Sequence, residues 1–379
     1  MNSLRDIVEL SPQLRVIETQ AMYGLQGQEA AQPLAPPRWN WGEVRKVLLV
    51  RLRSIGDTVL ATPSAFALKR FVPKIQVDML VEDWVAPLLD HHPHINNVIA
   101  LERGELMARL RVARELRAQK YDVVYNLHGG TTATFLTRAS GARHRVGFKT
   151  YQYAQLHNHQ APSPLLLWGQ QKTHSVEQQL ALLGWTGVPV TDRPPTRLGV
   201  SPEAAETVNQ RLAGVGLADR KIALIHPAAA FATKQWATEN FAQVAEYVAE
   251  RGFAPVAVAA PHEQAVLENL VAESSVHIET FHLSLPEVTA LAARSQVFVG
   301  NDSGIAHIAA AVETRCVVVF GSSNITHWRP WNSAPAEIVF EQMACQPCHG
   351  YFCEKFAQPE CILRVPVARV TAAIDRVLS

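Results

Sequence analysis

The clearest chemistry in this chain lies where an apolar strand gives way to a helix. The sequence NDSGIAHIAAA (301–311) follows the apolar run QVFVG and precedes a second apolar run, CVVVFG. A turn that opens directly into a helix exposes the first, unpaired N–H groups of that helix, and such a terminus favours anions. The spacing therefore predicts that Asp302, Ser303 and Gly304 lie on an anion-binding turn, with His307 one helical turn beyond. A histidine in an alanine-rich helix is also typical of a structural side chain, and both interpretations stay open.

Asp57 stands in a similar place earlier in the chain. The apolar run KVLLVRL leads through Gly56 and Asp57 into a helix that we expect to begin near Thr58. Ligands collect beyond the carboxyl ends of parallel strands, so a carboxylate here is placed to act as a general base on a hydroxyl. The same position suits a helix N-cap, whose oxygen accepts from the free N–H groups of the first turn. Local sequence does not separate the base from the cap.

Lys234 lies in a third segment of this kind, HPAAAFATKQW, which follows the apolar run KIALIH. Small residues let a ligand approach backbone N–H groups, and a lysine supplies a point charge suited to phosphate. A solvated loop cation is the competing interpretation. The segment lacks the spacing of a P-loop, and neither half of the chain carries the G-x-G-x-x-G pattern, which argues against a dehydrogenase.

Four of the 5 cysteines cluster near the C-terminus, with the spacing C-x2-C-x4-C-x7-C: Cys345, Cys348, Cys353 and Cys361. Four thiolates suit a tetrahedral Zn²⁺ site. The spacing is not that of a common zinc ribbon, so reduced, packed thiols or a conditional disulfide are alternatives. Cys316, inside an apolar run, is interpreted as a small core residue. We expect no cofactor and no catalytic metal, with structural zinc at the cluster as the alternative.

Composition narrows the class of protein. A chain of 379 residues that is 48% hydrophobic and 18% charged can form two ordinary cores. A net charge of +1 argues against a dedicated nucleic-acid binder. No apolar run reaches the roughly 20 residues of a membrane span, and the N-terminus lacks a signal-peptide pattern, so we expect a cytoplasmic protein. Residues 101–150 hold ten Lys/Arg and four Asp/Glu, which fits a solvated helix face or a surface for an anionic partner.

The elements that would position these residues alternate regularly. Residues 1–44 form a poorly patterned extension of unknown role, in which AAQPLAPPRWNW resembles an extended linker. The first domain, 45–195, has strands at 46–52, 75–81, 96–101 and 121–128 and helices at 58–71, 84–89 and 105–119. The second, 196–379, has strands at 221–226, 254–260, 276–279, 296–300 and 316–321, helices at 238–251, 262–272, 285–293 and 305–312, and a C-terminal helix. Strands separated by helices pair in parallel through right-handed crossovers, which predicts two doubly wound α/β domains in tandem.

Taken together and in order, these motifs resemble glycosyltransferase family 9, which contains the ADP-heptose:lipopolysaccharide heptosyltransferases. The segments that carry the resemblance are RLRSIGDTVLATPSA, GARHRVGF, THSVEQQLALL, HPAAAFATKQW, NDSGIAHIAAA and the cysteine cluster, and they span residues 46–379. The resemblance implies the GT-B fold, two facing Rossmann-like domains with parallel, doubly wound sheets. It also implies an inverting, metal-independent transfer of a heptose from ADP-heptose to a hydroxyl of the lipopolysaccharide inner core.

The resemblance assigns roles by motif. Asp57 matches the catalytic base, and Lys234 matches the lysine that contacts the donor diphosphate. The remaining donor-binding matches are Asp302, Ser303, Gly304 and His307 in the D-[ST]-G-x-x-H motif, and Glu263 in AAPHEQ as an acidic residue near the nucleoside. The loop AAAFAT departs from the family pattern because it lacks the paired threonines of some members.

The implied partners are an ADP-sugar donor and a lipid-linked lipopolysaccharide core acceptor, with no nucleic acid and at most peripheral contact with the inner face of the inner membrane. Charge on the first domain favours Arg143, Arg145 and Lys149 as the surface for this anionic acceptor. Two rival classes remain: a GT-B transferase or epimerase that uses another nucleotide sugar, and a non-catalytic nucleotide-sugar-binding module in which Asp57 has no role.

Overall fold

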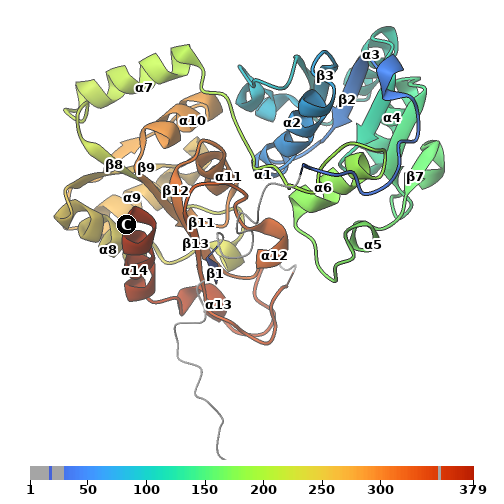
Figure 1. The fold of residues 1–379 in the computed structure, drawn as a ribbon. Helices are drawn as coiled ribbons and strands as arrows, with labels where there is room; N and C mark the ends of the chain where they lie inside the picture. Colours follow the sequence, from blue (N-terminus) through green and yellow to red (C-terminus); the bar gives the residue numbers. More distant parts are fainter. Residues whose placement is uncertain (1–16, 19–29, 349–350) are drawn as a thin grey trace, which may run out of the picture.

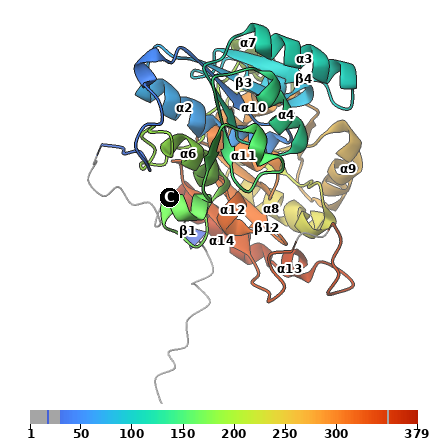
Figure 2. The same ribbon diagram turned by 90° about the vertical axis from the view of Figure 1, so that its right-hand side faces the viewer.

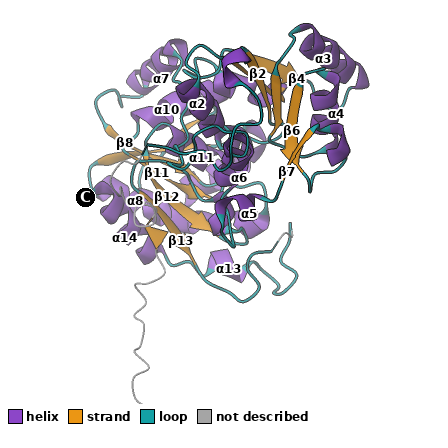
Figure 3. Ribbon diagram, turned by 45° about the vertical axis from the view of Figure 1, so that its right-hand side comes forward, coloured by secondary structure: helices purple, strands orange, loops and turns teal. Residues whose placement is uncertain are grey.

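The protein consists of two α/β domains, which lie on the right and the left of Figure 1. The computed structural model describes residues 17–18, 30–348 and 351–379. Helices cover both faces of the sheet in each domain, as the colouring by element in Figure 3 makes visible. Strands buried on both faces read as continuous apolar runs rather than as alternating patterns, which is why KVLLV and KIALIH are recognisable from sequence.

The first domain contains six parallel strands in the order β4-β3-β2-β5-β6-β7. They are β2 (Lys46–Val50), β3 (Gln76–Glu82), β4 (Asn97–Leu101), β5 (Val123–Asn126), β6 (His144–Phe148) and β7 (His159–Ala161). Its helices are α1 (Ile55–Val59), α2 (Thr62–Phe71), α3 (Leu106–Ala118), α4 (Thr131–Ala139), α5 (Pro164–Trp168) and α6 (Ser175–Gly184), with a 3-10 helix η3 (Asp83–Leu89). The direction of winding reverses between β2 and β5, which is the switch point where open α/β sheets bind ligands.

The second domain repeats this design, with the parallel order β10-β9-β8-β11-β12-β13 and a short strand, β1 (Ile17–Glu18), antiparallel to β13. Its other strands are β8 (Lys221–His226), β9 (Phe253–Val258), β10 (Glu279–Phe281), β11 (Val297–Asn301), β12 (Arg315–Phe320) and β13 (Ala336–Phe340). The α-helices are α7 (Pro202–Gly214), α8 (Thr238–Glu250), α9 (Gln264–Glu273), α10 (Leu285–Arg294), α11 (Gly304–Ala311), α12 (Ile325–Trp328), α13 (Glu360–Leu363) and α14 (Val367–Leu378). The predicted fold class, two doubly wound α/β domains, is confirmed.

The domains meet where α1 packs against α11, and one cluster of buried apolar side chains continues through this contact. Two glycines make the close approach possible. A Cβ at Gly56 would lie 2.7 Å from His307 Cδ2, and a Cβ at Gly304 would lie 2.6 Å from Ile55 Cβ. A side chain at Gly304 would therefore force the two helices apart, and a side chain at Gly56 would displace the ring of His307. Figure 2 shows the molecule from the side of the first domain.

The predicted helix at 58–71 is wrong in its start and in its continuity. The structure has α1 at Ile55–Val59 and a separate α2 at Thr62–Phe71. Pro63 occupies the first turn of α2, where a missing N–H costs nothing, whereas inside a longer helix it would break a hydrogen bond. The break frees α1 to point across to the second domain.

The stretch interpreted as an extended linker packs along the first domain. The N–H groups of Leu34 and Ala35 both donate to Gly184 O, at 3.0 and 3.1 Å. Trp41 is buried and its Nε1 donates to Thr186 O at 2.9 Å, while Trp39 stacks on His144 with ring centroids 4.4 Å apart. Residues 30–44 thus cover one side of the first domain instead of spanning solvent.

None of the helices in the described part of the chain has the length and apolar character needed to cross a membrane.

Candidate active site

Asp57 is the third residue of α1, and Ser54 is the N-cap. The Ser54 hydroxyl accepts from Asp57 N at 3.3 Å and donates to Asp57 Oδ2 at 2.8 Å. The interpretation of Asp57 as the N-cap is therefore wrong, because Ser54 performs that function. Arg53 and Ser54, with φ of 74° and 24°, form a sharp turn that sets the direction in which the Asp57 carboxylate points.

Arg51 holds this carboxylate in place. Its Nη2 forms an ion pair with Asp57 Oδ1, and its Nη1 donates to Leu127 O at 2.6 Å. The Arg51 and Asp57 side chains are only 11% and 17% exposed, so water screens the pair weakly. The carboxylate is consequently fixed by two donors at the carboxyl edge of the first sheet.

The first domain, with Asp57, forms one wall of the candidate site, and the second domain forms the other. On this second wall, Lys234 and Asp302 form an ion pair with Nζ 2.8 Å from Oδ2. Ser323 Oγ also donates to Asp302 Oδ2. Lys234 ends the 3-10 turn η5 (Ala232–Lys234) after β8, and Asp302 follows β11, so neighbouring strand ends bring the two residues together. An ammonium group carries three donors, which leaves Lys234 able to bind an anion while it contacts Asp302.

The N-terminus of α11 is open to an anion. Ser303 is the N-cap residue, but its side chain makes no capping hydrogen bond; Ser303 Oγ is instead hydrogen-bonded to His226 Nδ1 at 3.2 Å. Burial lowers the pKa of His226 to about 4, so its ring is neutral near pH 7. The first N–H groups of α11 are thereby left without a side-chain cap, and the helix dipole adds positive potential at the same end.

His307 connects the two walls. Its ring lies against Gly56 of the first domain, and burial lowers its pKa, while the charges of Asp302 and Asp57 act in the opposite direction. His307 is close enough to both carboxylates for their charges to affect its pKa, so it lies between Asp57, the predicted base, and the Lys234–Asp302 ion pair. The structure therefore brings Asp57, Lys234, Asp302 and His307 into one site, as the motifs predict.

Glu263 lies just beyond β9 at the same edge of the second sheet. Its Oε2 accepts from Ala260 N at 2.9 Å and closes the turn η6 (Pro261–Glu263). The carboxylate thus has a local structural role, and contact with a nucleoside stays a prediction.

The three basic residues predicted as one acceptor surface do not lie together. Arg143 and Arg145 are at the amino end of β6, whereas Lys149 follows its carboxyl end. Arg143 is exposed and lies 3.7 Å from Glu43, and Arg145 Nη1 donates to Ala142 O at 2.6 Å. Ligands gather at the carboxyl edge of a parallel sheet, so among these three only Lys149 is on the side of the site.

Sequence reasoning missed two residues beside Asp57. It gave no role to Arg51, the ion-pair partner, or to His128, which follows β5 at the carboxyl edge. Burial and the charge of Arg51 lower the pKa of His128 to about 4, with Asp57 acting in the opposite direction. The signal available in the sequence was the position of both residues directly after apolar runs.

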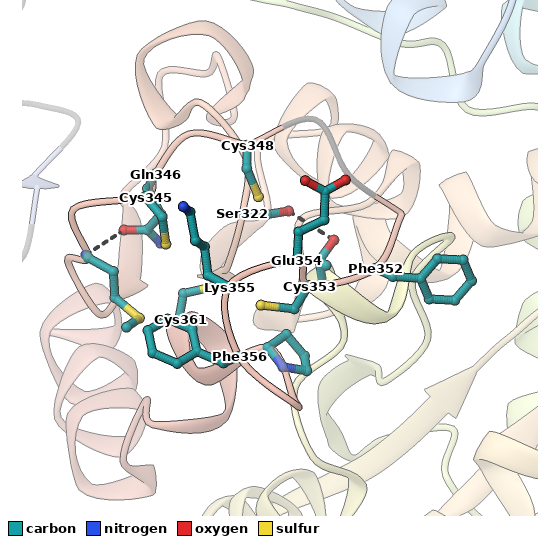
Figure 4. A pocket seen from close by; sticks show the side chains of 13 residues that line it. Ser322, Cys345, Gln346, Cys348, Phe352, Cys353, Glu354, Lys355, Phe356 and Cys361 are labelled. Carbon is teal, nitrogen blue, oxygen red and sulfur yellow. Dashed lines mark hydrogen bonds between the residues drawn. The ribbon is translucent and has the colours of Figure 1, made fainter.

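The four clustered cysteines are free thiols and line one cavity, which Figure 4 shows from close by. Burial raises the pKa of Cys361 to about 11, and the charges of the three other cysteines act in the same direction. Since such an effect requires short distances, the four thiols lie near one another. Cys316 lies buried in β12, as predicted for a core residue. Among the described residues, no three side chains of ligand type are yet arranged to hold a metal ion.

Comparison with known proteins gives consistent matches. The model of glycosyltransferase family 9 (heptosyltransferase) matches residues 109–356. Lipopolysaccharide heptosyltransferase 3 of Escherichia coli is 28% identical over 348 residues, covering 86% of this chain and 97% of that protein. The crystal structure of the glycosyl transferase family 9 from Veillonella parvula DSM 2008 has a TM-score of 0.76 at 19% identity and covers 88% of this chain and 97% of that one. The structure of E. coli ADP-heptose lps heptosyltransferase II has a TM-score of 0.71 at 20% identity, covering 88% and 98%.

Two doubly wound domains, with a fixed carboxylate on one domain and a lysine and an uncapped helix N-terminus on the other, are the architecture of the GT-B class, and the family match identifies the chain as a glycosyltransferase of this class. The chain belongs to glycosyltransferase family 9, the heptosyltransferase family, as its motifs indicate.

Proposed function

We propose that the protein transfers a heptose from ADP-heptose to a hydroxyl of the lipopolysaccharide inner core, with inversion at the anomeric carbon and without a catalytic metal ion. The observation that supports this proposal is the α1–α11 contact, since Asp57 on α1 lies near His307 on α11, which also interacts with the charges of Lys234 and Asp302. The donor assignment is supported by the similarity to a solved neighbour, the ADP-heptose lps heptosyltransferase II of E. coli.

Asp57 is the base in this mechanism. Its carboxylate accepts the proton of the acceptor hydroxyl, whose oxygen forms a bond to the anomeric carbon as the bond from that carbon to the diphosphate oxygen breaks. Attack from the face opposite the leaving group inverts the anomeric carbon. Arg51 and Ser54 keep the carboxylate in position, which reduces the loss of freedom required to reach the reactive geometry.

The leaving diphosphate gains negative charge as the bond breaks. The Lys234 ammonium, the N–H groups at the start of α11 and a donor nitrogen of neutral His307 supply positive potential at one place. Because burial lowers the pKa of His307, its ring adds a hydrogen-bond donor without a full charge. These groups perform the role that a divalent cation has in metal-dependent transferases.

The acceptor is proposed to lie on the first domain. Arg53 is exposed on the turn that precedes Asp57, and Lys149 follows β6 at the same edge. Both suit the phosphate or carboxylate groups of an inner-core acceptor. Arg143 and Arg145 are left out of this acceptor surface because they lie at the opposite end of β6.

A lipid-linked acceptor requires contact with a membrane, and α3 and α4 offer a suitable face. Helix α3 buries Ala108, Val112 and Leu116 and exposes Leu106, Met107, Leu110, Arg114 and Arg117 on the opposite side. Helix α4 packs beside it and exposes Phe135 and Arg138. Exposed apolar side chains among arginines are typical of helices that lie at the surface of an anionic bilayer.

The experiment is incubation of the purified protein with ADP-heptose and a set of inner-core acceptors, some without heptose and some that already carry heptose. We expect a glycosylated acceptor plus ADP, with the anomeric configuration of the new linkage opposite to that of the donor by NMR. An epimerised nucleotide sugar, or binding without turnover, would favour one of the rival classes. Transfer from another nucleotide sugar in preference to ADP-heptose would overturn the donor assignment alone.

Membrane contact is tested by sedimentation with vesicles that contain anionic phospholipid. Replacing Leu106 and Leu110 by serine should reduce the bound fraction, whereas Val215→Ser, at an exposed apolar position of the second domain, should not. Equal binding by both variants would remove α3 from the proposal without affecting the transfer reaction.

A further inference from the structure

A long connection, residues 341–359, joins β13 to α13. In the described part of it no helix or strand forms, and Tyr351, Phe352 and Phe356 are exposed, Phe352 to 78%. Structureless connections longer than about 12–15 residues are uncommon in compact domains and are usually functional. Among the described residues of this segment none is a buried apolar side chain, so packing in the core does not hold it.

Cysteine is the residue type that this segment repeats. Cys345, Cys348 and Cys353 lie on it, and Cys361 lies on α13 directly after it. All four line one cavity of about 390 Å³, and in Figure 4 their sulfur atoms face the same space, which Lys355 also enters. The cavity has more than one partly exposed thiol, unlike the environment of buried Cys316.

We propose that Cys345, Cys348, Cys353 and Cys361 bind one tetrahedral, thiolate-preferring metal ion, Zn²⁺ or iron, that holds the segment 341–359 against α13. Four thiols each lose a proton to solvent and four metal–sulfur bonds form, so that a divalent ion leaves a net charge of −2 on the centre. The Lys355 ammonium lies in the same cavity and offsets part of this charge. Metal binding requires the four thiols to move closer together than they are in the structure. The segment can accommodate that movement because its described residues form few backbone hydrogen bonds with one another.

The centre would also support the donor wall. Cys348 N donates to Ser322 O at 3.0 Å, and Gln346 Nε2 donates to Gly321 O at 2.7 Å. Ser322 Oγ in turn donates to Thr233 Oγ1 at 3.0 Å, directly before Lys234. A metal ion that fixes Cys345 and Cys348 therefore fixes the backbone beneath the donor ion pair. This coupling rests on the proposed function, whereas metal binding itself does not.

Metal binding is tested on the full-length protein, purified under reducing conditions and analysed for metal content. We expect about one zinc or iron ion per chain, as for a single closed tetrahedral site. Cobalt added to the metal-free protein should give the intense thiolate-to-cobalt absorption and the visible bands of tetrahedral coordination. A protein with no bound metal, or with a disulfide within the cluster after purification under reducing conditions, overturns the proposal.

Variants identify the ligands. Cys345→Ser with Cys348→Ser should abolish stoichiometric binding and the cobalt spectrum, whereas Cys316→Ala, a buried cysteine outside the cavity, should retain both. Cys361→Ser alone should weaken binding by about 10-fold or more. Full binding by the double variant overturns the assignment. An ADP affinity that is unchanged in a metal-free double variant overturns the coupling to Lys234 and leaves the metal site standing.

Discussion

Replacing Asp57 by asparagine separates the catalytic role of this residue from its structural one. Asparagine keeps the size of the side chain and still offers one oxygen to Arg51 and Ser54, but it carries no charge and cannot take a proton from the acceptor. A positioned general base contributes about 10²–10⁴-fold to the rate, which corresponds to about 3–5 kcal/mol of barrier. We therefore expect kcat to fall by at least about 100-fold.

The structural cost of the same change is smaller. Removing one partner of a fully buried ion pair costs about 3–5 kcal/mol, but Arg51 keeps its hydrogen bond to Leu127 O and gains the asparagine oxygen as a neutral acceptor. The expected loss of unfolding free energy is therefore about 1–2 kcal/mol. A domain with about 5–15 kcal/mol of stability stays folded after such a loss, so unfolding cannot account for the slower turnover.

The assay combines kcat at saturating substrates, the thermal midpoint of unfolding and the dissociation constant of ADP. Arg51→Gln is the matched control, because it removes the same ion pair and leaves the carboxylate. The reasoning is refuted if Asp57→Asn retains a near-wild-type kcat, or if Arg51→Gln lowers kcat as far while stability changes equally. A lower ADP affinity in Asp57→Asn would show that the two walls are not separate in function.

Further predictions concern the donor wall, acidity, metal dependence and the domain contact. Lys234→Ala and His307→Ala should each weaken ADP binding by about 1.5–3 kcal/mol in calorimetric titration, because each removes a hydrogen bond to the charged diphosphate. Unchanged affinity in both variants would show that the donor binds elsewhere. The pKa of His226 is about 4 in the fold against 6.5 when unfolded, so the unfolded chain binds more protons between these values and stability should fall by up to about 3 kcal/mol as pH drops through that window. Urea unfolding at several pH values measures this loss, and the slope should be shallower in His226→Gln. Transfer should proceed equally with and without added Mg²⁺ or Mn²⁺; a rate that appears only with Mg²⁺ would contradict the proposed mechanism. Gly56→Ala should lower kcat in steady-state assays and weaken ADP binding as well, because its Cβ would lie 2.7 Å from the ring of His307 and displace it.

The alternation of strands and helices was predictable because the central strands are buried on both faces and read as apolar runs. VFVGN, for example, is buried at all five positions of β11. The strands β6 (HRVGF) and β7 (HQA) were not identified, since both carry polar residues, and β7 is in addition a short strand at the edge of the sheet. That omission also explains the error over the basic residues. Without β6, nothing in the sequence distinguishes Arg143 and Arg145 at one of its ends from Lys149 at the other.

The set of residues that form the candidate site was predictable, because the carboxyl ends of parallel strands lie along one edge of the sheet. The pairing between those residues was not. Lys234 and Asp302 follow two adjacent strands of the sheet, and their ion pair depends on the strand order rather than on any local spacing. The role of Ser54 as the N-cap was likewise hidden, since serine and aspartate three residues apart are both good caps.

The absence of side chains at Gly56 and Gly304 has a consequence for how this gene can vary. Every single-nucleotide change of a glycine codon that alters the amino acid adds a side chain, and here the added Cβ would lie 2.7 Å from the His307 ring or 2.6 Å from Ile55. Neither position has a conservative neighbour in the genetic code, so no gradual route leads away from glycine while the helices stay in contact. In a library of random single substitutions selected for an intact cell envelope, these two codons should be among the least tolerant in the gene, although neither residue has a side chain that could contact the substrate.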